Sequence, residues 1–263
     1  MGSNWFSKDP KEHLAGKTAI VMGGGSGIGK AAAQTLAAAG ANLVIAGIPE
    51  APLHESVEEI KAEGGNAIAV LTDGTKMDQL ENLVNTTVKE FGGLDIVVSS
   101  AGIAIPRANS LDVKKEDWDR IFSINLDANF FLAQAAGRVM KDNPDGGQMV
   151  FVSSQRGISA MENIAPYSIT KAAVMGMVRS LAIDFAQYQI CVNGIAPGYV
   201  MTDIVRNVFK ENPAQEEYVY SRTPLKKLGT LDDMAAAILL LCLPQASYTT
   251  GQTLILDGGW SVQ

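Results

Sequence analysis

Several residue types that mark common classes of protein are scarce in this chain of 263 residues. It holds only two histidines, His13 and His54, so the side chain most often used for proton transfer near neutral pH is almost absent. The two cysteines, Cys191 and Cys242, lie in apolar runs, which indicates buried free thiols in a reducing cytoplasm. No cluster of carboxylates or histidines suggests a metal site, and none is expected.

Basic residues and long apolar segments are also few. The chain has 21 lysines and arginines against 28 aspartates and glutamates, and the net charge of −7 argues against a nucleic-acid-binding surface. The longest apolar run, Met234 to Leu243, is too short to span a membrane. The first ten residues contain no apolar core of a secretory signal. We therefore expect a cytoplasmic protein that binds neither nucleic acid nor membrane.

Strand and helix patterns alternate along the chain. Short runs rich in valine and isoleucine predict strands, and Ala-rich or amphipathic segments between them predict helices. The predicted strands are 17–22, 42–46, 67–71, 94–99, 148–153, 190–195 and 253–256, and the predicted helices are 28–39, 53–63, 77–91, 115–140, 166–188 and 231–243. Strands that are apolar on both faces and separated by helices indicate a doubly wound parallel sheet of the Rossmann type. We expect one domain over residues 15–263, after an N-terminal tail of residues 1–14.

One long segment does not fit this alternation. Residues 203–227 mix polar groups with Val205, Phe209 and Tyr218, and we expect an irregular excursion between a strand and the next helix. Long irregular segments in compact domains are often functional lids. We interpret this segment as a substrate lid, and an ordinary surface excursion is the alternative.

The first strand is followed by a glycine-rich turn with the spacing Gly23-x-x-x-Gly27-x-Gly29. Small residues between a strand and a helix let the backbone approach a pyrophosphate, and the helix N-terminus points its amides at the negative charge. A flexible turn without a ligand is the alternative. The position between a valine-rich strand and an Ala-rich helix favours the phosphate site.

Tyr167 and Lys171 stand four residues apart in a predicted helix, so the phenol and the ammonium share one face. A nearby positive charge is expected to lower the pKa of the tyrosine and make it a proton donor and acceptor for a carbonyl/alcohol interconversion. Such pairs also arise by chance on solvated helix faces. The pair alone is therefore weak evidence, and the other motifs decide.

Taken together, these motifs resemble the short-chain dehydrogenase/reductase family over nearly the whole chain. The resemblance adds Ala101-Gly102 after the fourth strand, Asn125 in a helix, Ser154 thirteen residues before Tyr167, and an ending Asp257-Gly258-Gly259. It implies a catalytic tetrad of Asn125, Ser154, Tyr167 and Lys171. It also implies cofactor contacts at Gly23, Ser26, Gly27, Ile28, Gly29, Gly47, Ile48, Asp73, Gly74, Ser100, Ala101, Gly102, Tyr167, Lys171, Pro197, Gly198, Val200 and Thr202.

Each member of the tetrad has an implied role and a simpler alternative. Tyr167 would exchange a proton with the substrate oxygen, and Lys171 would lower the tyrosine pKa and hold the nicotinamide ribose. Ser154 would hydrogen-bond the carbonyl oxygen, or else cap a turn. Asn125 would orient a water that connects Lys171 to solvent, or else mark a helix kink or cap.

The choice between NAD and NADP is not readable from the usual positions. Relatives place an aspartate at Gly47 or an arginine at Ile48, and this chain has neither. No arginine or lysine lies in the glycine-rich turn, and Glu50 would repel a 2′-phosphate, so we slightly favour NAD. A lysine from elsewhere in the fold could still reach the phosphate. Further departures are Met22 before the first glycine and Ser99-Ser100 in place of an Asn-Asn pair.

We thus expect an oxidoreductase that moves hydride between a nicotinamide cofactor and a secondary alcohol or ketone. Arg107 and Arg156 follow strand ends on the nicotinamide side, which suggests a keto acid or sugar acid substrate, although Arg156 could instead pair with Glu162. A 3-oxoacyl-thioester reductase and a non-catalytic nucleotide-binding protein remain alternatives, whereas the four-residue Tyr–Lys spacing disfavours an enoyl-thioester reductase. The resemblance also implies a homotetramer.

Overall fold

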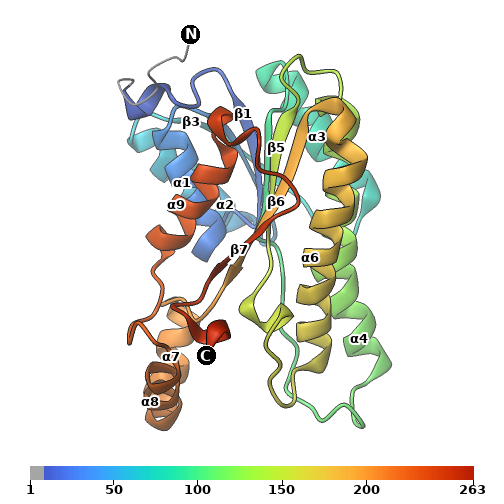
Figure 1. Ribbon diagram of the computed structural model, residues 1–263. Coiled ribbons are helices and arrows are strands. Elements are labelled where there is room, and N and C mark those ends of the chain that lie inside the picture. Colours follow the sequence, from blue (N-terminus) through green and yellow to red (C-terminus); the bar gives the residue numbers. More distant parts are fainter. Residues whose placement is uncertain (1–8) are drawn as a thin grey trace.

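Seven strands form one parallel sheet at the centre of the computed structural model, which describes residues 9–263 (Figure 1). The strand order is β3-β2-β1-β4-β5-β6-β7, and every neighbouring pair is parallel. The strands are β1 (Thr18–Met22), β2 (Asn42–Gly47), β3 (Asn66–Leu71), β4 (Ile96–Ser99), β5 (Gly147–Val152), β6 (Ile190–Pro197) and β7 (Thr253–Leu256). The predicted doubly wound sheet is confirmed.

Helices cover both faces of the sheet, as Figure 1 shows. One face carries α1 (Gly27–Ala38), α2 (Glu50–Ala62) and α9 (Leu231–Cys242), and the other carries α3 (Met77–Phe91), α5 (Ala128–Met140) and α6 (Ala165–Phe185). Helix α4 (Lys115–Phe122) packs beside α6. Helices α7 (Asp203–Glu211) and α8 (Pro213–Arg222) project beyond the sheet near the C-terminus. The last helix, α9, lies beside the first, α1, although about 200 residues separate them.

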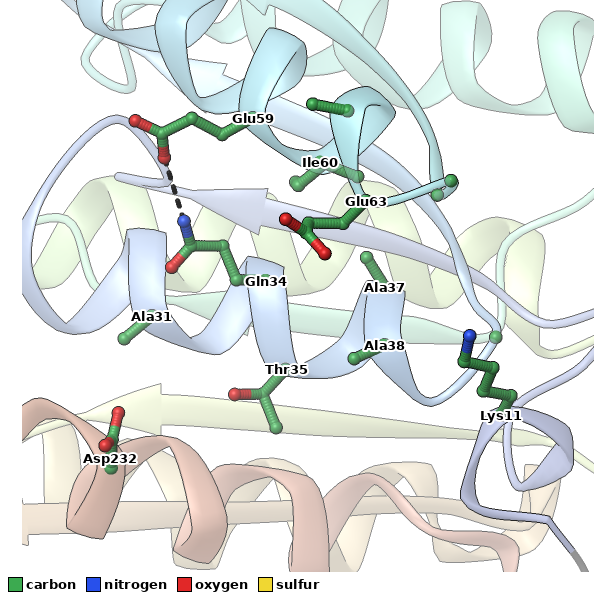
Figure 2. Close-up of a pocket in the computed structure, with 14 residues that line it drawn as sticks. Lys11, Ala31, Gln34, Thr35, Ala37, Ala38, Glu59, Ile60, Glu63 and Asp232 are labelled. Atoms are coloured by element: carbon green, nitrogen blue, oxygen red, sulfur yellow. Dashed lines mark hydrogen bonds between the residues drawn. The ribbon is translucent and has the colours of Figure 1, made fainter.

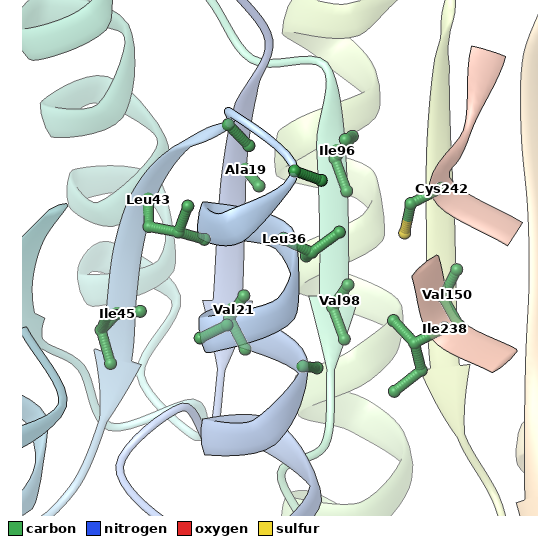
Figure 3. Close-up of a cluster of buried hydrophobic side chains, with 14 of the residues drawn as sticks. Ala19, Val21, Leu36, Leu43, Ile45, Ile96, Val98, Val150, Ile238 and Cys242 are labelled. Atoms are coloured by element: carbon green, nitrogen blue, oxygen red, sulfur yellow. The ribbon is translucent and has the colours of Figure 1, made fainter. Parts of the chain in front are cut away.

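Each strand supplies two hydrophobic cores because successive side chains point to opposite faces. In β1, Ala19 and Val21 join the core under α1, α2 and α9, while Ile20 and Met22 join the core under α3, α5 and α6. Figure 3 shows the first core, where Leu36 of α1 meets the strands. Burial on both faces explains why the strands read as continuous apolar runs.

The sheet has a topological switch point between β1 and β4. From β1 the chain moves outward through β2 to β3, then returns across the sheet to β4 on the other side of β1. The two crossovers diverge there and leave a crevice at the carboxyl ends of the strands, where doubly wound sheets bind their ligands. A ligand site is therefore expected at the loops after β1 and β4.

The long helix predicted over 115–140 is not α-helical along its whole length. Residues Ser123–Asp127 form a π-helical turn between α4 and α5. This turn widens the hydrogen-bond ladder, and the side-chain amide of Asn129 donates to the carbonyl oxygen of Asn125 at 2.7 Å. The segment predicted as one helix over 115–140 is therefore helical throughout, with Asn125 in a π-helical turn that joins α4 to α5.

The segment expected to be irregular, 203–227, holds the two helices α7 and α8. Local signals explain the second of them: Pro213 occupies its first turn, and the side chain of Asn212 accepts a hydrogen bond from the backbone N–H of Gln215 at 3.3 Å. Asn212 and the connection after Arg222 lie outside these two helices.

The predicted tail is packed over its last residues, while residues 1–8 lie outside the described part of the chain. Pro10–Glu12 form a short 3₁₀ turn, and Leu14 is completely buried in the core under α1. The backbone N–H of Leu14 donates to the carbonyl oxygen of Ala39 at 2.8 Å. Packing therefore begins before the predicted domain boundary at residue 15.

Candidate active site

A cavity of about 380 Å³ lies at the switch point, at the carboxyl ends of β1 to β4. It is lined by twelve of the predicted cofactor residues: Gly23, Ser26, Gly27, Ile28, Gly47, Ile48, Asp73, Gly74, Ser100, Ala101, Gly102 and Thr202. Six further residues line it that the sequence did not suggest: Met22, Thr72, Thr75, Ile103, Ile124 and Ala128. Thr72 and Thr75 could have been found from their position beside Asp73.

The glycine-rich turn is built so that only glycine fits at its key positions. Gly23 has φ of +80°, and a Cβ there would come within 3.0 Å of the backbone nitrogen of Ala101. Gly27, at the start of α1, has φ of +52° and open space where a side chain would be. Its exposed backbone at a helix N-terminus beside the cavity is the cradle that a pyrophosphate needs. The cavity therefore fits a dinucleotide.

The other six predicted cofactor residues lie outside this cavity, and two of them, Tyr167 and Gly198, line a second one. Gly29 packs helix α1 on the turn, where a Cβ would clash with the carbonyl oxygen of Gly23. Val200 is buried and bridges to Gly229 through the backbone. Pro197 ends β6, while Tyr167 and Lys171 lie on α6.

Lys171 is a buried residue of helix α6 that lies next to the dinucleotide cavity. Its ammonium donates a hydrogen bond to the carbonyl oxygen of Val152 at 3.0 Å and lies 5.8 Å from the ring centre of Tyr167. A Cβ added to Gly102 would come 3.2 Å from the same ammonium, so glycine leaves room for it. Complete burial lowers the pKa of Lys171 to about 8.

Asn125 ties the β4 loop to α6 from within the π-helical turn. Its side-chain oxygen accepts from the backbone N–H of Ile103 at 2.7 Å, and its side-chain nitrogen donates to the carbonyl oxygen of Ile103 at 2.9 Å. The same nitrogen also contacts the hydroxyl of Thr170 at 3.2 Å. The amide is therefore a brace between two segments, and a water-orienting role stays a prediction.

Tyr167 lies near the hydroxyl of Ser154 and the guanidinium of Arg156. Burial raises the pKa of Tyr167, while the Ser154 hydroxyl and the positive charge of Arg156 act in the opposite direction. The expected lowering of this pKa by Lys171 is not found, because desolvation of the phenolate outweighs the neighbouring charges. The structure nevertheless brings the four predicted catalytic side chains together. The side-chain oxygen of Asn125 and the ammonium of Lys171 lie 3.3 Å and 3.2 Å from the position of a Cβ added to Gly102, and Lys171 in turn lies beside Tyr167, which adjoins Ser154.

A second cavity, of about 270 Å³, adjoins this cluster. Gly102 and Ile103 line the dinucleotide cavity, and the next residues of the same loop, Ala104 and Ile105, line the second one. Its remaining walls are Arg107, Ser154, Gln155, Arg156, Met161, Ile164, Tyr167, Gly198 and Tyr199. Both arginines predicted to contact substrate therefore face the same space as the serine and tyrosine.

A larger groove, of about 870 Å³, lies elsewhere on the protein, between α1, α2, α9 and the turn at Lys11 (Figure 2). Alanine and glycine make up half of its walls, and its polar side chains partly satisfy each other, as in the 2.8 Å hydrogen bond from Gln34 to Glu59. No residue of either cavity at the switch point takes part in it. We find no reactive group there that would make it an active site.

Residues 9–263 contain no group of three or more side chains that could together hold a metal ion. No helix in the same range has the length and apolar character needed to cross a bilayer.

Comparison with known proteins agrees with this geometry. The family model described as enoyl-(acyl carrier protein) reductase matches residues 23–261. The chain belongs to the short-chain dehydrogenase/reductase family. It is 36% identical to the 7alpha-hydroxysteroid dehydrogenase of Escherichia coli, with 94% of each chain covered. It is 38% identical to the L-rhamnose 1-dehydrogenase (NAD(P)(+)) of Azotobacter vinelandii, covering 94% of this chain and 97% of the relative.

Solved structures of other family members superpose closely. A putative gluconate dehydrogenase from Agrobacterium tumefaciens gives a TM-score of 0.91 at 30% identity, covering 97% of this chain and all of the other. A 7alpha-hydroxysteroid dehydrogenase complexed with NADH and 7-oxo glycochenodeoxycholic acid gives 0.90 at 35% identity, covering 96% and 97%. The chain is thus an NAD(P)-dependent oxidoreductase that transfers hydride between a nicotinamide cofactor and an alcohol/ketone pair.

Proposed function

We propose that Tyr167 is the general acid and base of this reaction, with Ser154 beside it at the substrate oxygen. The observation that carries the proposal is that Ser154 and Tyr167 line the same cavity, close enough for the serine hydroxyl to affect the pKa of the tyrosine. A bound nicotinamide supplies the hydride. Tyr167 then gives its proton to the oxygen during reduction and recovers it during oxidation, while the hydroxyl of Ser154 stabilises the charge on that oxygen.

Lys171 and Asn125 act on the tyrosine and the loop in this proposal. The ammonium of Lys171, held by the carbonyl oxygen of Val152, lies close enough to the phenol ring to favour the phenolate once the site closes. It also serves as the contact to the nicotinamide ribose. Asn125 fixes the backbone at Ile103, between the two cavities, and orients the water that connects Lys171 to solvent.

We propose NAD as the preferred cofactor. The dinucleotide cavity is lined by one carboxylate, Asp73, and by no lysine or arginine. Hydrogen bonds from the backbone and side chain of Thr75 lower the pKa of Asp73, so the carboxylate is charged at neutral pH. Lys30, the lysine nearest the glycine-rich turn in the chain, is held by Glu59 at 2.8 Å and Glu55 at 3.5 Å. Nothing in the cavity wall offers a 2′-phosphate a positive partner.

Steady-state oxidation of NADH and NADPH with a panel of ketones tests the activity and the cofactor choice together. We expect kcat/KM for NADH to exceed that for NADPH by about tenfold, and Ile48→Arg to narrow the gap by adding a phosphate partner. Leu111→Arg, at a side chain that is 94% exposed and outside the cavity, is the matched control. A tenfold preference for NADPH in the wild type would reverse the assignment.

A 3-oxoacyl-thioester reductase is the second candidate, favoured by the acyl-carrier-protein description of the matching family model. Acetoacetyl-CoA and crotonyl-CoA distinguish the possibilities. Consumption of NADH with the first alone would support ketone reduction on a thioester. Reduction of the second would indicate double-bond reduction, which the four-residue Tyr167–Lys171 spacing disfavours.

The assembly we propose is a homotetramer in the cytoplasm. The side chains of Phe130, Ile169 and Ile183 on α5 and α6 are 39%, 45% and 78% exposed, and they offer apolar surface for symmetry-related helices. Light scattering should give four times the 27.8 kDa of one chain, and a monomer would contradict the assignment. The two free buried cysteines support a reducing compartment, which cell fractionation would test.

Helices α7 and α8 form the substrate lid in this proposal. Tyr218 of α8 contacts the ring of Trp260 at a centroid distance of 5.9 Å, and Trp260 also contacts Tyr199 of the second cavity at 5.6 Å. Motion of α8 would therefore shift Trp260 and, through it, Tyr199 in the wall of the second cavity. Limited proteolysis should cut residues 203–227 more slowly with NADH and a substrate analogue present, and equal rates would contradict the lid.

A further inference from the structure

The second cavity has an unusual charge balance. Two guanidinium groups, those of Arg107 and Arg156, line it, and no carboxylate does. The chain as a whole carries a net charge of −7, so a purely positive cavity is not a consequence of overall composition. Two like charges in a recess of about 270 Å³ repel each other unless an anion lies between or beside them.

Arg156 is held in one orientation by aromatic rings. Its guanidinium carbon lies 5.2 Å from the ring centre of Trp260 and 5.6 Å from that of Tyr199, and one terminal nitrogen donates to the Tyr199 hydroxyl at 3.2 Å. Contacts of the guanidinium with the faces of aromatic rings leave its N–H groups available to a ligand. Only one of its five N–H donors has a partner in the part of the chain that the structure describes.

Neither arginine has an acidic partner within residues 9–263. The pair between Arg156 and Glu162 that the sequence allowed does not form, and Arg107 makes no ion pair or hydrogen bond there. The backbone N–H of Arg156 donates to the hydroxyl of Ser154 at 3.1 Å, so the arginine belongs to the same segment as the serine proposed to contact the substrate oxygen. The guanidinium of Arg156 is thus held by aromatic rings, has no acidic partner among residues 9–263, and lies near the proposed catalytic residues.

From these contacts we infer that the substrate is a hydroxy acid or keto acid whose carboxylate is bound by Arg156, with Arg107 as a second cation at the more exposed side. A carboxylate matches the planar edge of a guanidinium and would occupy two of its free N–H donors. Apolar walls from Ile105, Met161 and Ile164 would contact the carbon chain of the acid. This inference rests on the proposed function, because it places the acid beside Ser154 and Tyr167.

The competing explanation is that Arg156 only joins Tyr199 to Trp260. Arg222 of α8 provides the comparison, because its guanidinium carbon also stacks on Trp260, at 5.7 Å, yet it does not line the cavity. If stacking were the whole role, removal of either arginine would have a similar effect. If Arg156 binds the acid, only its removal would depend on the charge of the substrate.

The experiment compares charged and neutral substrates on variants of Arg156 and Arg222. Pyruvate, acetoacetate, levulinate and a keto-sugar acid, each beside its primary amide, are assayed on wild type, Arg156→Met, Arg156→Lys and Arg222→Met. For the acids that the wild type reduces, we expect kcat/KM to fall about 100-fold in Arg156→Met, with partial recovery in Arg156→Lys. The amides should change less than about threefold, and Arg222→Met should treat acid and amide alike.

A binding measurement separates failure of this inference from failure of the proposed function. Calorimetry with NADH uses Tyr167→Phe as an inert background, with and without Arg156→Met, so turnover is not needed. Acids should bind the first protein and not the second. Equal binding by both, absence of acid binding to the first, or turnover of dihydroxyacetone phosphate in place of every acid would overturn the carboxylate assignment. Failure of the function itself would show instead as no reduction of any ketone, charged or neutral, by the wild type.

Discussion

The two cavities that meet at the β4 loop are opposites in construction and in charge. The dinucleotide cavity is walled mostly by backbone and small residues from turns after successive strands, and its one charged side chain is Asp73. The second cavity is walled by long side chains from three distant segments, and its charged groups are Arg107 and Arg156. The shape of the dinucleotide cavity is thus set mainly by the path of the backbone. The shape of the second cavity is set mainly by the side chains that line it.

This contrast explains why one half serves many enzymes of the family and the other does not. A pyrophosphate needs only close backbone and a helix N-terminus, which the fold itself supplies. Substrate recognition needs specific side chains at specific places, and these can change without altering the sheet. The relatives named for a steroid, a sugar and gluconate agree with a common cofactor half and a variable substrate half.

The largest effect should come from the phenol of Tyr167, the proposed general acid and base. We expect Tyr167→Phe to lower kcat at least 100-fold while the Kd for NADH changes little, because a general acid–base group contributes about 10²–10⁴-fold. Tyr188→Phe, at a half-exposed tyrosine after α6, is the matched control. Stopped-flow turnover and fluorescence titration with NADH measure the two quantities. A variant that keeps more than a tenth of wild-type kcat would remove Tyr167 from the chemistry.

The same contrast sets how much could be predicted from the sequence. The sheet and the glycine-rich turn were predictable, because burial on both faces requires continuous apolar strands and the φ values at Gly23 and Gly27 restrict the residues that fit. The tyrosine–lysine pair was predictable because helix geometry fixes its spacing. The packing of Arg156 on Trp260 was not, because 104 positions separate them and no local rule links them.

Two errors had physical causes of the same kind. The lowered pKa expected for Tyr167 counted the nearby charge of Lys171 and left out burial, which depends on the whole fold. The pairing of Arg156 with Glu162 followed proximity in the chain, whereas the folded protein offers the arginine two aromatic rings instead. Short-range patterns predict the backbone better than they predict the surroundings of a long side chain.

A second prediction concerns the dinucleotide cavity, where adding one methyl group at Gly29 should weaken NADH binding. A Cβ at Gly29 would lie 2.1 Å from the carbonyl oxygen of Gly23, so Gly29→Ala must push α1 away from the glycine-rich turn. Overpacking costs about 1–3 kcal/mol, and contact with backbone lies at the upper end, so we expect NADH affinity to fall at least about 30-fold. Gly93→Ala is the control, because no atom lies within 4 Å of its added Cβ. Unchanged affinity in Gly29→Ala would mean that the turn adapts and that its backbone geometry is not what binds the cofactor.

The smallest expected effect is on stability, and it comes from Lys171, which is buried between the two cavities. The unfolded chain keeps the ordinary lysine pKa of 10.5, while burial lowers the pKa in the folded protein to about 8. Below pH 8 both states are protonated and the folded protein bears the full cost of the buried charge. Between these two pKa values the folded lysine is neutral and the unfolded one is still charged, so stability gained from this group rises with pH. Relative to Lys171→Met, the wild type should therefore gain about 1 kcal/mol of unfolding free energy between pH 7 and pH 9.

Urea unfolding at fixed protein concentration, at several pH values in that range, measures this gain. Lys141→Met, at an exposed lysine, controls for the loss of one positive charge. The methionine variant leaves the carbonyl oxygen of Val152 without the 3.0 Å hydrogen bond from Lys171, so the absolute difference in stability mixes two effects. Its change with pH isolates the titration, because the lost hydrogen bond to a carbonyl adds no titrating group of its own. A flat difference between pH 7 and pH 9 would show that the folded lysine keeps its proton throughout, and the ammonium would then be available to the cofactor half at every working pH.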